Sequence, residues 1–346
     1  MRRVISTTLI GLGAFLIMAA VLVKFYAHPS LATMPTNYES TTELQAIDAT
    51  IFDASTLEPK STDLAISSYT VADSDVATPD GVVVWVNRTS ILDTSVEGAT
   101  CDPTVNAALP GCFQQTSDRS PFGAQSGAAA ACPDCGSYVD ESVDVGGEYV
   151  VEQVEVNRSG QIFKAPFDMG KTDLQWWDAS LGEATTMSYV STEKVDGLET
   201  YKFVQTIEPT QIGTRDLPGS VFDVSDDTIT ADEMYGMVRT IWFEPTTGSP
   251  VKRVEVRNQY FAFEGQDVPA FVGTVEYTPD TVSGLVDDGK FQSFFLGGMV
   301  WLFPLTMIVL GLAAIAVLKA MGHDLPTPLL PQITQLITQH ARAAMA

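Results

Sequence analysis

Side chains capable of acid–base or nucleophilic chemistry are unevenly distributed along this chain. Its three histidines are His28, His323 and His340, so none lies between residues 29 and 322. A Ser-His-Asp or Cys-His arrangement needs a histidine inside the folded site. The sequence also lacks the G-x-S-x-G, H-E-x-x-H, Walker and dinucleotide-binding motifs. We therefore expect a protein that is not an enzyme, with no catalytic residue, no cofactor and no bound metal.

Carboxylates are abundant, and they are concentrated in the middle of the chain. Of the 43 acidic residues, only Asp324 lies outside 27–290, and this interval holds 14 basic residues, so its formal charge is 14 − 42 = −28. Such a surface repels phosphate, which excludes nucleic acid as a partner. A glycan-acting enzyme with two facing carboxylates is a remaining alternative, although solvated surface carboxylates explain the composition more simply.

Four cysteines lie within one short stretch of the acidic interval, at Cys101, Cys112, Cys132 and Cys135. Four cysteines allow three pairings, and the sequence does not choose among them. Pro110-Gly111, Pro121 and the Gly-Ala run 123–131 predict a loop across 101–135. We expect disulfides that stabilise this loop, as is usual for exported proteins. The C-x-x-C spacing of 132–135 also fits a redox pair, but no helical pattern follows it.

Two long apolar runs flank the acidic interval. Val4–Val23 and Phe291–Leu318 are each long enough to cross a hydrocarbon core as a helix. Arg2, Arg3, Lys319 and Arg342 follow the rule that positive residues near span ends stay in the cytoplasm, whereas Lys24 opposes it. The alternative for the first run is a signal peptide cleaved near Ser30-Leu31-Ala32.

These patterns predict four parts. Residues 1–26 form a cytoplasmic N-terminus and a first transmembrane helix, 27–290 an extracytoplasmic β-rich domain, 291–318 a second transmembrane helix, and 319–346 a cytoplasmic tail. Helical spacing in 333–344 indicates a short amphipathic helix in the tail. The expected location is a bacterial plasma membrane, with both termini cytoplasmic.

Short runs of β-branched and aromatic residues, separated by turn signals, predict strands throughout the domain. Asp196-Gly197 is typical of a hairpin turn between 187–192 and 199–207. Glu244–Gly248 separates two further runs, 238–243 and 251–263, and a last strand covers 270–277. No long helical periodicity is evident in the domain between the two spans. The expected fold is a mainly β ectodomain, a sandwich or an open barrel, between two transmembrane helices.

The most distinctive motifs lie between residues 160 and 263. They are Phe163-Lys164-Ala165-Pro166-Phe167-Asp168, Trp176-Trp177-Asp178, the Glu193–Phe203 hairpin and Glu244-Pro245-Thr246-Thr247-Gly248. With the two terminal spans, this set resembles an actinobacterial envelope family often labelled porin PorA-like, formerly a domain of unknown function. The cysteine loop 101–135 has no counterpart in the family pattern.

The resemblance implies a role in mycolic-acid-containing envelopes, in the trafficking of trehalose mycolates or the maturation of lipoglycans. It also implies a fold similar to class B scavenger receptor ectodomains. The partners it implies are membrane lipids, an envelope glycolipid and an MmpL-type exporter or envelope-assembly complex. Two apolar helices, in place of the many strands of a porin barrel, supply the membrane crossing in this chain.

A β-rich shell can enclose an apolar cavity, and burial of an acyl chain is favourable by about 0.8 kcal/mol per methylene. The expected lipid-binding residues are the aromatic side chains Phe167, Trp176, Trp177, Tyr189, Tyr201, Phe203 and Trp242. Because neighbouring residues on a strand point to opposite faces, only one of the two adjacent tryptophans can face such a cavity. The function expected is non-catalytic binding or transfer of an envelope lipid, and the alternative is a structural subunit with a solid β core.

Overall fold

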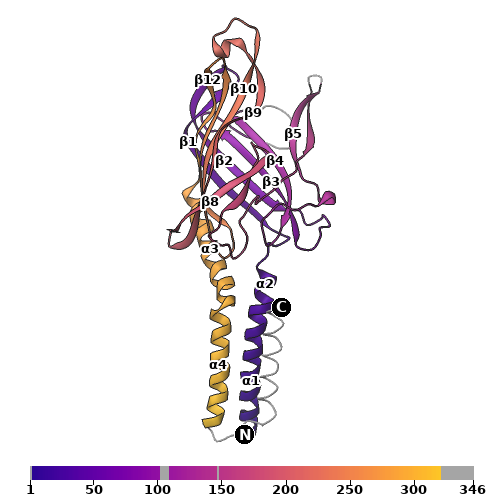
Figure 1. The fold of residues 1–346 in the computed structure, drawn as a ribbon, viewed down its shortest axis with the longest axis vertical. Helices are drawn as coiled ribbons and strands as arrows, with labels where there is room; N and C mark the ends of the chain where they lie inside the picture. The colour runs from indigo at the N-terminus through magenta and orange to yellow at the C-terminus, as the bar shows by residue number, and fades with distance from the viewer. Residues whose placement is uncertain (1, 102–108, 146–147, 321–346) are drawn as a thin grey trace. The chain divides into compact units, whose positions relative to one another are not determined.

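The computed structural model describes residues 2–101, 109–145 and 148–320 (Figure 1). The described chain divides into two compact units. One is helical and contains residues up to Leu31 together with those from Phe295 onward, and the other is the β unit Ala32–Phe294. The tail helix expected in 333–344 lies outside the described residues.

The helical unit contains α1 (Arg2–Leu22), a π-helical turn η1 (Val23–Ala27), α2 (His28–Leu31) and α4 (Leu302–Ala320). Within the described residues, two segments are long and apolar enough to cross a membrane, Thr8–Leu31 and Leu302–Ala320. Helices α1 and α4 pack closely where glycines meet, since a Cβ added to Gly13 would lie 2.9 Å from the carbonyl oxygen of Gly311. Such an arrangement fits a membrane-anchored protein.

The helix boundaries differ from those expected. The first helical segment continues to Leu31, beyond residue 26 and through Ser30. The single run 291–318 is divided between α3 (Pro279–Val300) and α4, with the break at Trp301. Pro304 explains the break, because in a continuous helix its ring would clash with the carbonyl of Val300 and its nitrogen has no hydrogen to donate to that carbonyl. The sequence shows no long helical periodicity in the domain 27–290, yet the first half of α3 lies within it.

The β unit consists of strands connected by short turns. In the described residues these are β1 (Glu39–Asp53), β2 (Glu58–Ala72), β3 (Val82–Asp93), β4 (Cys112–Gly123), β5 (Tyr138–Val145), β6 (Glu148–Glu155), β7 (Leu174–Asp178), β8 (Glu183–Val195), β9 (Leu198–Pro218), β10 (Thr228–Phe243), β11 (Pro250–Phe263) and β12 (Gln266–Tyr277). Two 3₁₀ turns, η2 (Pro133–Cys135) and η3 (Gly219–Phe222), lie between strands.

The described strands form one twelve-stranded antiparallel sheet in the order β6-β5-β4-β3-β2-β1-β12-β11-β10-β9-β8-β7 (Figure 1). This confirms a mainly β domain and gives one curled sheet in place of a two-sheet sandwich. Isolated bridges pair Phe122 with Ala129, Ala128 with Gln161, and Gln161 with Trp176. These bridges connect β4 to β7, the last strand in the order, so the sheet curls back toward itself.

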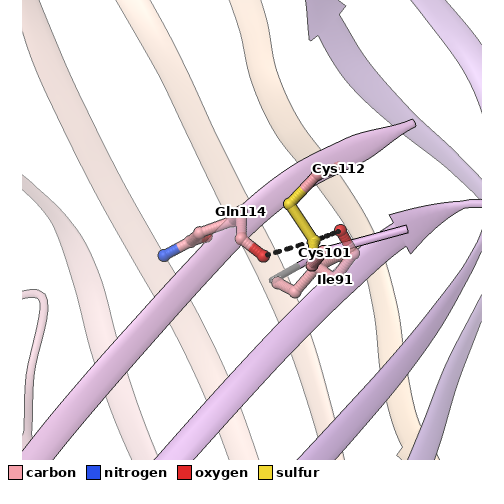
Figure 2. The surroundings of a disulfide bond; sticks show 4 residues. All are labelled: Ile91, Cys101, Cys112 and Gln114. Carbon is pink, nitrogen blue, oxygen red and sulfur yellow. Dashed lines mark hydrogen bonds between the residues drawn. A yellow bond between two sulfur atoms is a disulfide. The ribbon is translucent and has the colours of Figure 1, made fainter. Parts of the chain in front are cut away.

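The loop expected across 101–135 was wrong for Cys112–Gly123, which forms β4 and pairs with β3 from Val82↔Gly123 to Leu92↔Cys112. The polar residues of β4 do not favour a strand by themselves, and β4 forms because β3 pairs with it. Cys101 is bonded to Cys112, and Cys132 to Cys135. Figure 2 shows the first disulfide against the strand edge, with Cys101 Sγ 3.7 Å from the carbonyl oxygens of Ile91 and Gln114.

The turn predictions at 196–197 and 244–248 are confirmed. Asp196 and Gly197 have φ of 45° and 85°, as a two-residue hairpin turn requires. In the second turn, the buried carboxylate of Glu244 accepts hydrogen bonds from the backbone N–H groups of Thr246 and Thr247. The carbonyl of Gly248 then accepts from Ala165 N–H at 2.9 Å, which attaches the Phe163–Asp168 segment to this turn.

Gly248 provides a test of this close approach. It has φ +69°, and a Cβ there would lie 2.1 Å from the carbonyl oxygen of Ala165, whereas Gly182 has φ +70° with open space around it. We expect Gly248→Ala to lower the free energy of unfolding by about 2–5 kcal/mol, because backbone strain and a steric clash add together. Gly182→Ala should cost only about 1–2 kcal/mol. Denaturant unfolding of both variants measures the difference, and equal losses would contradict the packing described.

Candidate functional site on the inner face of the sheet

Most of the buried side chains of strands β7 to β12 lie on one face of the sheet. Residues that pair directly across neighbouring strands point to the same side of a sheet. Such pairs connect Leu174 to Met187, Met187 to Gln205, Gln205 to Arg239, Arg239 to Glu255, and Glu255 to Val275. We call this side the inner face, and the opposite side the outer face.

Four of the seven aromatic residues expected at a lipid site meet on the inner face. Trp176 and Phe203 are buried in one cluster, and Tyr189 and Tyr201 pack against it while keeping part of their surface exposed. The ring centroids of Tyr189 and Phe203 are 5.6 Å apart, and those of Tyr189 and Tyr201 are 5.9 Å apart, both near edge-to-face. These distances lie in the range that aromatic pairs prefer.

The other three aromatic residues lie elsewhere. Trp177 follows Trp176 on β7 and so faces outward, although it is also buried. Trp242 packs on the outer face against Leu198 and against Val286 of α3. Its indole N–H donates to the Glu193 carboxylate at 2.8 Å. The seven residues thus do not line one common cavity.

Phe167 lies outside the strands, beside a buried lysine. The Nζ atom of Lys164 is 3.8 Å from the centroid of the Phe167 ring and donates to the carbonyl of Ala165 at 2.7 Å. Among the described residues, no carboxylate forms an ion pair with Lys164, which is only 2% exposed. Burial lowers the pKa of the Lys164 ammonium to about 7.

A charged network lies next to the aromatic cluster on the inner face. Arg239 on β10 is buried, and its Nε donates to Glu255, its Nη1 to Gln205 at 2.6 Å and its Nη2 to Asp178 at 3.2 Å. The hydroxyl of Tyr235 also donates to Asp178, at 3.0 Å. This network therefore crosses β7, β9, β10 and β11 through side chains alone.

Glu255 is the centre of this network, with its side chain fully buried. Arg253 and Arg257, two residues before and after it on β11, also donate to its carboxylate. Burial alone would raise the pKa of Glu255, but Arg239, Arg253 and Arg257 together hold that pKa well below its usual range. Burial likewise raises the pKa of the Tyr235 phenol, which keeps it a neutral donor.

The inner face is not filled everywhere. The side chains of Arg253 and Arg257 keep 31% and 24% of their surface accessible, although Glu255 between them keeps none. The side chains of Arg253 and Arg257 are therefore partly accessible, whereas the carboxylate between them is not. Apart from the inner face, a cleft of about 450 Å³ is formed by the β8–β9 turn, the β10–β11 turn and α3, with Leu198, Pro245 and Phe294 in its lining.

An aromatic cluster and a charged network share the inner face. The partly exposed Tyr189 and Tyr201 offer apolar contacts, and the partly accessible side chains of Arg253 and Arg257 offer charged contacts on the same face. Among the described residues, no group of three or more His, Cys, Asp or Glu side chains is placed to hold a metal ion.

The arginine network was not predicted from the sequence. A signal was present in Arg253-Val254-Glu255-Val256-Arg257, which alternates charged and apolar residues with the period of a strand. The ordinary interpretation of alternation points the valines inward. Here the valines face outward and Val256 is 52% exposed.

Glu255→Gln tests the central position of this carboxylate. The change keeps the shape but removes the charge that balances three guanidinium groups, so we expect a loss of about 3–5 kcal/mol in the free energy of unfolding. Glu276→Gln on neighbouring β12 is the matched control, because Glu276 faces outward, where a substitution should cost within about 0.5 kcal/mol. Chemical denaturation of the full chain in detergent compares the two, and similar losses would argue against a central role for Glu255.

Lys164 predicts a pH-dependent stability. Its pKa falls from 10.5 in the unfolded chain to about 7 in the folded one, so between these values the unfolded state binds more protons. The folded state therefore carries no penalty from Lys164 above pH 10.5, and stability is lost progressively as the pH falls from 10.5 to about 7. Relative to Lys164→Met, the wild-type chain should gain up to about 1.4 kcal/mol per pH unit between pH 7 and 9. Denaturation midpoints measure this, with exposed Lys171→Met as a control for the loss of a lysine, and a constant difference would refute it.

Comparison with known proteins gives one consistent family. The family model described as Porin PorA matches residues 5–318. A curated relative from Corynebacterium resistens, named Porin PorA, is 23% identical over 229 residues, which cover 62% of this chain and 55% of the relative. The match thus spans about half the length of that relative.

The family match begins within the first apolar helix, includes the whole sheet and ends within the second apolar helix. It therefore includes the inner-face network and the motifs between residues 160 and 263. On this extent of agreement, the chain belongs to the PorA porin family.

Proposed function

We propose that this chain is an envelope-biogenesis protein that binds a cell-envelope lipid on its β unit and hands it on without catalysis. In this proposal the two apolar helices anchor the chain in the plasma membrane, both termini are cytoplasmic and the sheet is extracytoplasmic. The lipid is a glycolipid such as a trehalose mycolate, and an MmpL-type exporter or an envelope-assembly complex delivers or receives it.

One observation carries the proposal, namely the amphiphilic composition of the inner face. Tyr189 and Tyr201 keep exposed surface at the edge of the ring cluster, and Arg253 and Arg257 keep exposed surface on the same side of the sheet. An amphiphile needs both kinds of contact, since its chains leave water and its head group must stay solvated or hydrogen-bonded. The acyl chain would lie against the tyrosines while the head group remains near the polar side chains.

A second function is favoured by a different observation. Phe203, Phe243 and Met187 are completely buried in the ring cluster, so this part of the inner face is already filled by side chains. A filled core suits a scaffold whose outer faces organise a transporter or glycosyltransferase complex. The two functions predict different contents for the purified protein.

Lipid analysis of the full chain distinguishes them. The protein is purified from its native membrane in mild detergent and examined by native mass spectrometry with lipid extraction. We expect a stoichiometric acylated lipid, and we expect Tyr201→Ser to reduce its occupancy roughly tenfold, since burial of an aromatic ring against a ligand contributes about 1.5–3 kcal/mol.

The matched control is Tyr69→Ser, the same substitution on β2, where Tyr69 faces outward and its hydroxyl donates to Glu39. Lipid occupancy should be unchanged in this variant. Empty protein that co-purifies with a transporter would support the scaffold function instead. Equal loss of lipid from both variants would show that the bound lipid does not lie on the inner face.

A further inference from the structure

The charges of the network around Glu255 do not cancel. Arg239, Arg253 and Arg257 carry three positive charges, and the carboxylates of Glu255 and Asp178 carry two negative ones, which leaves 3 − 2 = +1. This excess is found within a stretch of chain, residues 27–290, whose formal charge is 14 − 42 = −28. The excess lies on Arg253 and Arg257, whose side chains are partly accessible, and a positive site within so acidic a domain attracts an anion.

The donors of the three arginines are not used to the same extent. Arg239 is buried, and each of its three nitrogens donates to a protein acceptor. Arg257 directs Nε and Nη2 to Glu255, and within the described residues its Nη1 group has no protein acceptor. Arg253 also directs Nε and Nη2 to Glu255, and it lies beside the hydroxyl of Tyr277. Arg253 and Arg257 thus have accessible surface as well as positive charge.

Small residues lie near Arg257. Its partner across the β11–β12 ladder is Gly273, which has no side chain. A Cβ added to Gly273 would lie 3.0 Å from the Cβ of Ala49 on β1, so the next strand also offers only a methyl group there. On β12 the guanidinium of Arg257 is therefore bordered by Gly273 and by Phe271, whose ring centroid lies 6.0 Å from the guanidinium carbon.

We propose that Arg253 and Arg257 bind a monoanionic oxyanion, a phosphodiester or a carboxylate, in the head group of the amphiphile held on the inner face. A single negative charge neutralises the excess of +1, and guanidinium groups match the geometry of both oxyanions. A neutral sugar head group would leave the excess uncompensated. This inference rests on the proposed lipid-binding function and narrows its ligand to an anionic lipid, in place of the neutral trehalose mycolate given there as an example.

The test uses the full chain in a neutral detergent with two lipids of matched acyl chains, phosphatidylglycerol and phosphatidylcholine, and with inorganic phosphate as a competitor. Native mass spectrometry measures retained lipid. The wild-type protein should retain phosphatidylglycerol over phosphatidylcholine. Arg257→Gln should reduce that retention roughly tenfold, the effect of losing one charge-assisted hydrogen bond. Arg257→Lys should show an intermediate effect, because lysine keeps the positive charge but lacks the two parallel N–H donors of a guanidinium group.

Arg215→Gln is the matched control, because its side chain is 60% exposed and pairs with Glu233. It removes the same charge away from the network and should leave retention unchanged. Thermal melting confirms that each variant is folded, and Arg253→Gln replaces Arg257→Gln if the latter does not fold. Displacement of the lipid by millimolar phosphate would show that the site also takes free oxyanions, in support of the inference.

Two outcomes separate failure of this inference from failure of the proposed function. Equal retention of both lipids, unchanged in Arg257→Gln, would overturn the oxyanion site while leaving lipid binding intact. Retention of no lipid of any kind, including those carried from the native membrane, would overturn the proposed function and this inference with it.

Discussion

The interaction on which the β unit most depends is that of one buried carboxylate with three guanidinium groups. Glu255 accepts hydrogen bonds from Arg239, Arg253 and Arg257, and through Arg239 it is connected to Gln205 and Asp178. Because these residues come from four strands, the register of β7, β9, β10 and β11 is fixed by charge as well as by backbone pairing. A shift of any one strand by a single residue would turn its member of the network to the outer face.

This network also divides the inner face into regions of different character. On one side of it, rings such as Phe203 and Phe243 are completely buried and give the sheet a solid core. On the β12 side, Gly273 and Ala49 are small residues near Arg257, and the side chains of Arg253 and Arg257 stay partly accessible. A tightly packed region and a partly accessible region therefore lie next to each other on the inner face. A binding surface supported in this way is preorganised, because its arginines are already oriented by Glu255 before any ligand arrives.

Local patterns predicted much of the fold, and the reasons for the misses are physical. Asp196-Gly197 and Glu244–Gly248 act through their own backbone, so the two hairpins could be located from sequence. Strand β4 forms because β3 pairs with it, a long-range cause that its polar residues do not reveal. The aromatic residues were identified as a group, but one common cavity requires knowledge of which face each strand presents. The arginine network was missed because β11 reverses the usual rule and buries its charged side.

The glycine contact between α1 and α4 has a consequence for the order in which the protein is made. Gly13 and Gly311 touch across a sequence separation of about 300 residues, and contacts of such high separation are slow to form. The first apolar helix therefore remains without this partner until nearly the whole chain has been synthesised, whereas the hairpins of the sheet need only local sequence. Closure of the helix pair is thus a late event, which can follow only after the strands between the two glycines have been synthesised.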